Sequence, residues 1–316
     1  MAVEVVTIGE TMVAFIPHEH TYLRYAQQFG KVIAGAESNV AVGLAKLGHA
    51  SGWISKLGED EFGQFILREL QGEGVDVSHV LISETNPTGI MFKQFATDKE
   101  SSVYYYRNNS AASTFAPSDL DEAYIKEAKI LLVSGITPAL SETCKETIHK
   151  ALDIAKTHGV LVCFDPNIRR KLWSETEAKA VLEPLLSRCD IVILGEDEAQ
   201  LLIGESDPKK IVFALKRLGV RWIGVKMGSK GAYVADEHDE CFIDNYPVKV
   251  VDSIGAGDAF NAGFLCGLLE GRSILTCGKM GAMMGALAVS SYGDVEGLPN
   301  RKTFDRLFSN TQETKR

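Results

Sequence analysis

The chain contains the stretch Val250-Val251-Asp252-Ser253-Ile254-Gly255-Ala256-Gly257-Asp258-Ala259-Phe260, in which the valines of a predicted strand run into a glycine-rich turn. The turn opens a run of small and apolar residues over 259–269, which predicts a buried helix that ends at Gly271. Backbone N–H groups at such a helix start form an anion site, and the positive end of the helix dipole strengthens it.

An aspartate inside an anion site needs an explanation, because like charges repel. Asp258 could take the proton of a neutral hydroxyl beside the anion, as phosphoryl transfer to an alcohol requires. The alternative is a plain helix start, in which an acidic residue is favourable. The stretch alone leaves both interpretations open.

Length and charge limit the classes of protein to which the chain can belong. A chain of 316 residues suffices for one large α/β domain or two smaller ones. The net charge of −9 argues against a nucleic-acid or membrane-surface binder, because phosphate backbones demand clustered Lys and Arg. No apolar run approaches the ~20 residues of a membrane span, and the N-terminus begins with a strand pattern rather than a signal peptide.

Cysteine and histidine usage bears on compartment and on metals. The six cysteines are scattered and include no C-x-x-C pair, so we expect free thiols in a reducing cytoplasm. The seven histidines lack H-E-x-x-H or similar spacing, so a protein-caged transition metal is not expected.

Regular alternation of strands and helices dominates the second half of the chain. Continuous apolar runs predict strands at 130–133, 160–164, 191–194 and 222–225. Helices are predicted at 141–156, 175–186, 197–203, 209–218, 258–270, 274–289 and 303–308, followed by a frayed tail over 310–316. The alternation indicates βαβ units and a parallel sheet that helices cover on both faces.

The interval 88–107 breaks this rhythm. Two β-rich runs, 89–95 and 102–107, flank the polar turn 97–100 and predict a hairpin. Short strand-like pieces at 12–16 and 30–33 also lack a helical period. We expect these pieces to form a small separate sheet, inserted at about 12–33 and 88–107 into one domain that spans 1–316.

Polar residues follow the predicted strands at their carboxyl ends, where ligands of open parallel sheets collect. Strand 160–164 leads into a cluster that contains Asp165, Asn167 and Arg169. Strand 191–194 leads into Gly195-Glu196-Asp197-Glu198, whose carboxylates could orient Mg²⁺ through water or form the acidic first turn of a helix. Strand 222–225 leads into Lys226-Met227-Gly228-Ser229-Lys230-Gly231, which is either a tight turn or a loop that approaches phosphates or ribose.

Tyr105 and Arg107 project from the same face of a predicted strand, because side chains alternate along strands. A hydroxyl and a guanidinium that face a cleft would suit a polyhydroxylated acid. The alternative is a solvated strand face.

Several nucleotide-binding classes lack their signatures here. No Walker A motif and no H-R-D or D-F-G set occurs, which argues against a P-loop NTPase and a protein kinase. A dinucleotide-binding oxidoreductase needs G-x-G-x-x-G after the first strand, and Gly9-Glu10-Thr11-Met12 does not supply it.

Three motifs together resemble those of the ribokinase-like (PfkB) carbohydrate kinases. They are Gly35-Ala36-Glu37-Ser38-Asn39, Asp165-Pro166-Asn167-Ile168-Arg169 and Asp252-Ser253-Ile254-Gly255-Ala256-Gly257-Asp258. The resemblance covers nearly the whole chain. It implies a three-layer α/β/α core with a mainly parallel, doubly wound sheet and a small β-sheet lid, and phosphorylation of a sugar hydroxyl with ATP and Mg²⁺.

The resemblance also implies residue roles. Asp258 would be the general base, and the backbone N–H groups of Gly255, Ala256 and Gly257 would form the anion hole. Residues expected to bind the sugar are Gly35, Asn39, Tyr105, Arg107 and Arg169. Residues expected on the nucleotide side are Lys226, Gly228, Ser229, Gly231 and, in a Mg²⁺-associated motif, Glu198. A monovalent cation such as K⁺ would lie near Asp252.

The sequence departs from the family pattern at a few places. Gly195 replaces the usual Asn of the N-x-x-E motif, Ala34 replaces a glycine, and Ser253 stands where Thr is commoner.

Within the family, the motifs look most like those of 2-keto-3-deoxygluconate kinases, which phosphorylate the 6-hydroxyl of that sugar acid. Fructokinases are the alternative; they tend to have Pro at Glu37 and Ser-Ala-Asp at Ser110-Ala111-Ala112. Two cations, Arg107 and Arg169, could meet the carboxylate of a sugar acid, and fructose carries no such charge. The family further suggests a homo-oligomer formed through the lid.

Overall fold

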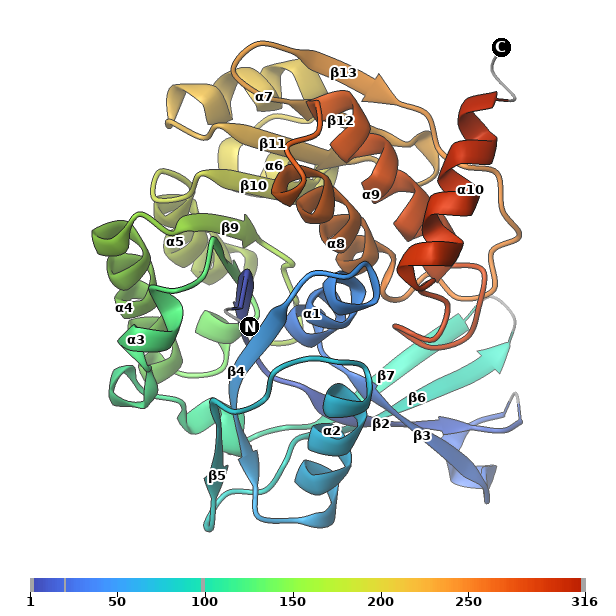
Figure 1. The fold of residues 1–316 in the computed structure, drawn as a ribbon. Helices are drawn as coiled ribbons and strands as arrows, with labels where there is room; N and C mark the ends of the chain where they lie inside the picture. The colour runs from blue at the N-terminus through green and yellow to red at the C-terminus, as the bar shows by residue number, and fades with distance from the viewer. Residues whose placement is uncertain (1–2, 20, 98–99, 314–316) are drawn as a thin grey trace.

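A nine-stranded β-sheet runs through the centre of the molecule (Figure 1). The computed structural model describes residues 3–19, 21–97 and 100–313. In the order of the sheet, the strands are β13 (Glu240–Ile243), β12 (Ala232–Ala235), β11 (Trp222–Lys226), β10 (Ile191–Gly195), β9 (Leu161–Asp165), β8 (Ile130–Ser134), β1 (Val5–Ile8), β4 (Ser51–Gly58) and β5 (Val80–Ser83). All neighbours from β11 to β5 pair in parallel, and only the β11–β12 and β12–β13 pairs of this sheet are antiparallel.

Helices cover both faces of this sheet and complete three layers. One face packs against α1 (Ala36–Lys46), α2 (Glu61–Gly72), α8 (Ala256–Leu269), α9 (Ile274–Ala288) and α10 (Arg301–Glu313). The other packs against α3 (Glu122–Ile125), α4 (Glu142–His158), α5 (Glu175–Leu186), α6 (Glu196–Ile203) and α7 (Pro208–Arg217). Successive residues of one strand serve opposite layers: Val5 of β1 belongs to the first core and Val6 to the second. No described helix has both the length and the apolar character that a membrane span requires.

The strand order reverses between β1 and β8, as expected for a doubly wound sheet. The chain places β4 and β5 to one side of β1, and β8 to β11 to the other. Ligands of such sheets bind at this switch point, beyond the carboxyl ends of the strands.

A second sheet of four strands lies to one side of the large one (Figure 1). Its order is β3 (Phe29–Ala34), β2 (Met12–Pro17), β6 (Ile90–Thr97) and β7 (Glu100–Tyr106). The β2–β6 pair is parallel, whereas β2–β3 and the hairpin β6–β7 are antiparallel. The pair β2–β3 and the hairpin β6–β7 come from separate stretches of the chain. The pairing of β2 with β6 joins these two stretches into one sheet.

Three expectations from the sequence fail. Val250 and Val251 lie in no strand: Val250 is 64% exposed, and the Val251 N–H donates to the carbonyl of Val289 at the end of α9. The last helix is longer than 303–308, since α10 spans Arg301–Glu313; Phe304 is buried and stacks on Phe308 one turn later. Residues 310–313 of the predicted frayed tail are thus helical, and 314–316 lie outside the described residues. The short elements β5 and α3 were not predicted, because four residues are too few to show a periodic pattern of apolar residues.

Candidate active site

The glycine-rich turn begins α8 and packs closely against a second loop. Gly255 caps the helix with a φ of 80°, a left-handed conformation that favours glycine. A Cβ atom on Gly255 would lie 2.6 Å from the carbonyl oxygen of Asp294, so the close approach also requires glycine. The first N–H groups of a helix have no intrahelical acceptor. The turn therefore presents backbone donors where the positive end of the helix dipole adds to them.

Asp258 lies in the first turn of α8 and is 8% exposed. Its Oδ2 accepts a hydrogen bond of 2.8 Å from Nδ2 of Asn39 in α1. Burial raises the pKa of Asp258 to about 7, and the charge of Asp165 adds to this, whereas Asn39, Arg169 and Lys226 oppose it. A carboxylate with a pKa near neutrality suits general base catalysis at physiological pH.

The ends of β9 and β11 meet beside this helix start. Asp165 ends β9, and its Oδ2 accepts from Nζ of Lys226 at 2.7 Å and from Nδ2 of Asn261 at 2.6 Å. Burial lowers the pKa of Lys226, but Asp165 and Glu198 outweigh it, so that the pKa is raised and the ammonium persists. A Cβ on Gly257 would lie 3.5 Å from that ammonium, which places a fixed positive charge next to the glycine-rich turn.

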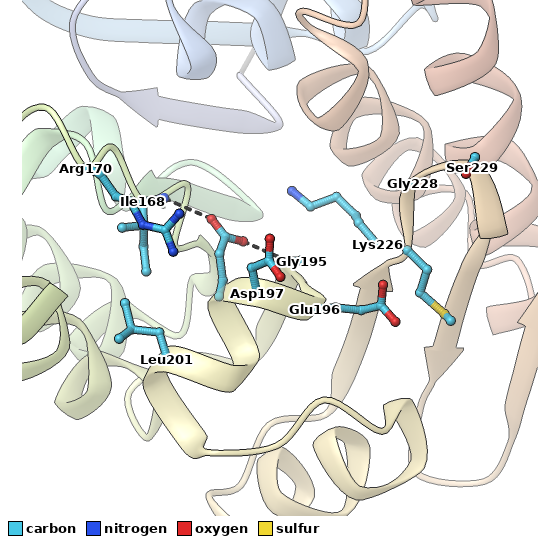
Figure 2. Close-up of a pocket in the computed structure, with 11 residues that line it drawn as sticks. Ile168, Arg170, Gly195, Glu196, Asp197, Leu201, Lys226, Gly228 and Ser229 are labelled. Carbon is cyan, nitrogen blue, oxygen red and sulfur yellow. Dashed lines mark hydrogen bonds between the residues drawn. The ribbon is translucent and has the colours of Figure 1, made fainter.

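A pocket of about 530 Å³ opens at the carboxyl ends of β10 and β11 (Figure 2). Its walls are Ile168 and Arg170, the start of α6, and the turn after β11. In Figure 2, Glu196 and Asp197 lie on the α6 side, and Gly228 and Ser229 on the other. Gly228–Lys230 form a tight 3₁₀ turn, and a Cβ on Gly231 would lie 2.1 Å from the carbonyl oxygen of Ile243. Gly231 thus packs against the backbone of β13 and does not line the pocket.

Glu198 holds the backbone of this pocket. Its Oε1 accepts from the N–H of Ile168 at 2.9 Å, and its Oε2 accepts from the N–H of Gly195 at 2.7 Å. Burial raises the pKa of Glu198, and the nearby charge of Asp165 adds to this. The acidic segment therefore does two things: Glu198 caps α6 and ties it to the loop after β9, while Glu196 and Asp197 face the pocket.

Arg107 lies immediately after β7 on the face that also carries Tyr105. The side chain is 6% exposed and forms an ion pair with Glu10, which also accepts from Oγ of Ser110 at 2.5 Å. The guanidinium carbon lies 5.7 Å from the centre of the Tyr105 ring. Nε of Arg107 has no hydrogen-bond partner among the described residues. Tyr104 and Tyr106 are 46% and 64% exposed on the opposite face, as the two-residue period predicts.

Arg169 and Gly35 complete the predicted sugar-side residues. Arg169 is exposed; burial raises the pKa values of both Asp258 and Glu37, and the charge of Arg169 opposes this rise in part. A Cβ on Gly35 would lie 2.6 Å from Oγ1 of Thr11, so the start of α1 packs directly on the segment after β1. Oδ1 of Asp252 accepts from the N–H of Ile254 at 3.1 Å, two residues along the chain.

The sequence profile of the pfkB family carbohydrate kinases matches residues 2–301. The chain belongs to the pfkB family of carbohydrate kinases. It is therefore a sugar phosphotransferase. The three family motifs lie at the start of α1, at the end of β9 and at the start of α8.

Relatives of this pfkB kinase match almost its whole length. A 2-dehydro-3-deoxygluconokinase of Bacillus subtilis is 40% identical over 98% of this chain and 96% of the relative. A 5-dehydro-2-deoxygluconokinase of Geobacillus thermodenitrificans is 30% identical over 94% of this chain and 89% of the relative. Among solved structures, a protein described as a putative ribokinase II from Escherichia coli, in complex with ATP and Mg²⁺, has a TM-score of 0.90 and 26% identity over 98% and 99% of the two chains. These similarities confirm the predicted family and the three-layer fold.

Some charged residues of the pfkB kinase site were not expected from the sequence. Glu10 follows β1, and the rule that ligands gather at strand ends would have found it. Glu37 is fully buried in the first turn of α1, where it accepts from Oγ of Ser134, and burial raises its pKa to about 7. Nζ of Lys93 and Oδ1 of Asp294 form a buried ion pair of 3.0 Å. A lysine within a β-rich run was the one feature of the sequence that could have indicated it.

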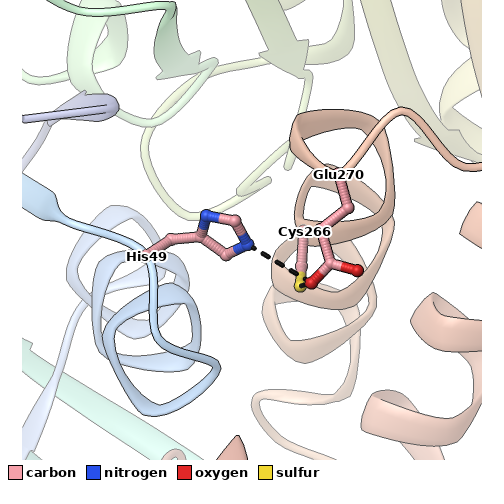
Figure 3. Close-up of side chains that lie close together, drawn as sticks. All are labelled: His49, Cys266 and Glu270. Carbon is pink, nitrogen blue, oxygen red and sulfur yellow. Dashed lines mark hydrogen bonds and ion pairs between the residues drawn. The ribbon is translucent and has the colours of Figure 1, made fainter.

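A separate cluster in the pfkB kinase holds potential metal ligands. Among the described residues, His49, Cys266 and Glu270 bring donor atoms together at the far end of α8 from Asp258 (Figure 3). Glu270 is already paired with the guanidinium of Arg301, whose Nη1 also lies 4.0 Å from Sγ of Cys266. The Arg301 guanidinium therefore already neutralises the Glu270 carboxylate, and this contact joins the end of α8 to α10.

Proposed function

We propose that this pfkB kinase transfers the γ-phosphoryl group of ATP to the 6-hydroxyl of 2-keto-3-deoxygluconate, also written 2-dehydro-3-deoxygluconate. The observation that carries the proposal is the buried Arg107, whose Nε has no partner among the described residues and which lies beside Tyr105. A guanidinium with a free donor binds a carboxylate through a charge-assisted hydrogen bond, whereas a hydroxyl of an uncharged hexose would accept only a weaker one. The name of the Bacillus subtilis relative is consistent with this substrate.

Asp258 acts as the general base in this reaction. Its carboxylate takes the proton of the 6-hydroxyl, and the hydroxyl oxygen then attacks the γ-phosphorus as the bond to ADP breaks. The backbone N–H groups of Gly255, Ala256 and Gly257 stabilise the charge on the transferred group. Lys226, fixed by Asp165, adds a positive charge at the same place. Gly35, Asn39, Tyr105 and Arg169 complete the sugar site.

The pocket beyond β10 and β11 takes the nucleotide. Lys226, Gly228 and Ser229 line it, and Gly231 shapes its turn. Mg²⁺ prefers oxygen ligands and keeps several waters, so Glu196 and Asp197 fit it as holders of water, with Glu198 behind them. When bound, Mg²⁺ neutralises phosphate charge. We also place K⁺ near Asp252.

The small sheet, inserted at about 12–33 and 88–107 into a single domain of 1–316, acts as a lid that excludes water from the reaction. Its exposed Tyr104 and Tyr106 fit an oligomer contact, and we propose a homo-oligomer through this face. The six free cysteines agree with a cytoplasmic location.

Two other substrates are candidates for direct comparison. Fructose would be phosphorylated by the same base and anion hole. 5-Dehydro-2-deoxygluconate, which appears in the name of the Geobacillus thermodenitrificans relative, carries a carboxylate that Arg107 would bind equally well.

An assay of the purified chain with ATP, Mg²⁺ and each sugar separates these candidates. We expect kcat/KM for 2-keto-3-deoxygluconate to exceed that for fructose by about tenfold or more, because fructose offers the buried donor a hydroxyl in place of a carboxylate. NMR of the product should place the phosphate on the 6-oxygen. A preference for fructose would refute the carboxylate role of Arg107, and a preference for 5-dehydro-2-deoxygluconate would refute the substrate alone.

A further inference from the structure

A buried ion pair joins the small sheet to the loop that follows α9. Nζ of Lys93 in β6 lies 3.0 Å from Oδ1 of Asp294, and the two side chains are 1% and 4% exposed. Burying two charges costs several kcal/mol of desolvation, and apolar residues of similar volume often stabilise a fold as well or better. Stability alone therefore explains this pair poorly.

The ion pair leads directly to Asp258. The Nδ2 group of Asn39 donates to Oδ2 of Asp258 at 2.8 Å and approaches Oδ2 of Asp294 at 3.3 Å. The backbone of Asp294 also packs on Gly255, where a Cβ atom would lie only 2.6 Å from the Asp294 carbonyl oxygen. Asp294 thus touches both the partner of the base and the turn that forms the anion hole.

We infer that Lys93 is a positioning residue: it holds Asp294 and, through Asp294 and the Asn39 amide, keeps the Asp258 carboxylate ionised and oriented. The inference rests on the function proposed above, in which Asp258 is the base. Because Lys93 belongs to β6, the chain of contacts is complete only while the small sheet lies against the large one. Closure of the small sheet and preparation of the base are therefore coupled.

Electrostatics gives the reason for this coupling. The groups that face Asp258 come from five neighbouring parts of the fold: Asn39 of α1, Asp165 and Arg169 at the end of β9, Lys226 of β11, Asp294 before α10, and through it Lys93 of β6. Without Lys93, two carboxylates would share one amide with no cation at Asp294. Like charges disfavour joint ionisation, so Asp258 would take up its proton at a higher pH.

The pH dependence of turnover tests the inference. Lys93→Met removes the charge, Lys93→Arg keeps it, and Lys31→Met is the matched control, since Lys31 is an exposed lysine of β3 that lies over the ring of Phe65. All variants are assayed with the sugar that the wild type phosphorylates best. In Lys93→Met we expect the acidic limb of kcat to move up by about one pH unit, and kcat at pH 7 to fall about fivefold. KM for ATP should stay within about twofold, Lys93→Arg should restore most of the activity, and Lys31→Met should match the wild type.

The outcomes separate the two proposals. The base assignment requires that the wild-type kcat falls at low pH and that Asp258→Asn removes this acidic limb. If either result is absent, the base assignment fails and the role of Lys93 fails with it. If the limb exists but Lys93→Met leaves it in place, the role of Lys93 alone is refuted, whatever sugar the enzyme prefers.

A double variant covers the case in which Lys93→Met folds poorly. Lys93→Met/Asp294→Asn removes both buried charges, so the acidic limb should return to its wild-type position even if sugar affinity changes. A limb that stays displaced would show that Asp294 does not transmit the effect. NMR of ¹³C-labelled aspartate carboxyls reports the same titration without turnover: in Lys93→Met the midpoint of Asp258 should rise, and an unchanged midpoint would overturn the inference.

Discussion

Asp258→Asn should make the protein more stable at alkaline pH while it abolishes most of its activity. Asn has nearly the same shape and keeps an oxygen that can accept from Nδ2 of Asn39. It carries no charge, so the cost of ionising a buried carboxyl disappears. Burial raises the pKa of Asp258 from 3.8 to about 7, and this difference corresponds to ~4 kcal/mol against the ionised form.

The sign of the pH dependence follows from the direction of this change. The folded protein binds the Asp258 proton more tightly than the unfolded chain does, so the wild type loses this stability as pH rises from about 4 to about 7. We therefore expect Asp258→Asn to be ~2–4 kcal/mol more stable than the wild type at pH 8.5 and nearly equal to it at pH 4. Turnover should fall about a hundredfold to ten-thousandfold, the usual contribution of a general base.

Urea unfolding at both pH values and steady-state kinetics measure these effects. Asp239→Asn, at an exposed position beside β13, is the matched control and should change neither quantity. Equal stability of Asp258→Asn and the wild type at pH 8.5 would refute the burial argument. Turnover within tenfold of the wild type would remove the base assignment, even if the stability result held.

Three further predictions concern the surroundings of the site. Gly9→Ala should cost about 3 kcal/mol of stability, because the new Cβ would lie 2.1 Å from Cδ of the buried Glu37; urea unfolding would contradict this with a loss below about 1 kcal/mol. Arg107→Met should raise KM for the sugar acid about tenfold or more while KM for ATP changes less than about threefold, and equal changes in both would argue against a carboxylate contact. Glu198→Gln removes one of two acceptors for backbone N–H groups, so KM for ATP should rise about fivefold with the sugar KM unchanged, and a purely sugar-side effect would contradict that role.

Much of the fold was predictable because its signals are local. The strands of the large sheet are buried on both faces, so they appear in the sequence as continuous apolar runs such as 130–133 and 191–194. The shared face of Tyr105 and Arg107 follows from the two-residue period of a strand. Val250 and Val251 show the limit of this reasoning, because β-branched residues also occur in exposed connections.

The candidate site was predictable to the extent that it follows strand ends and helix starts. The turn at 255–258 and the segments that begin at 165, 195 and 226 all lie where a parallel sheet places its ligands. The partners of these groups were not predictable. Arg107 with Glu10, and Lys93 with Asp294, are far apart in the chain, and no periodic pattern relates them.

The sequence by itself determined the family, the layered α/β architecture and the residue types that meet at the carboxyl edge of the sheet, because these depend on hydrophobic pattern and short motifs. Only the tertiary structure decided which charges are paired and which are free. Burial depends on packing between distant segments, and it is burial that brings the pKa of Asp258 near neutrality, ties Glu198 to two backbone N–H groups and encloses the Lys93–Asp294 pair.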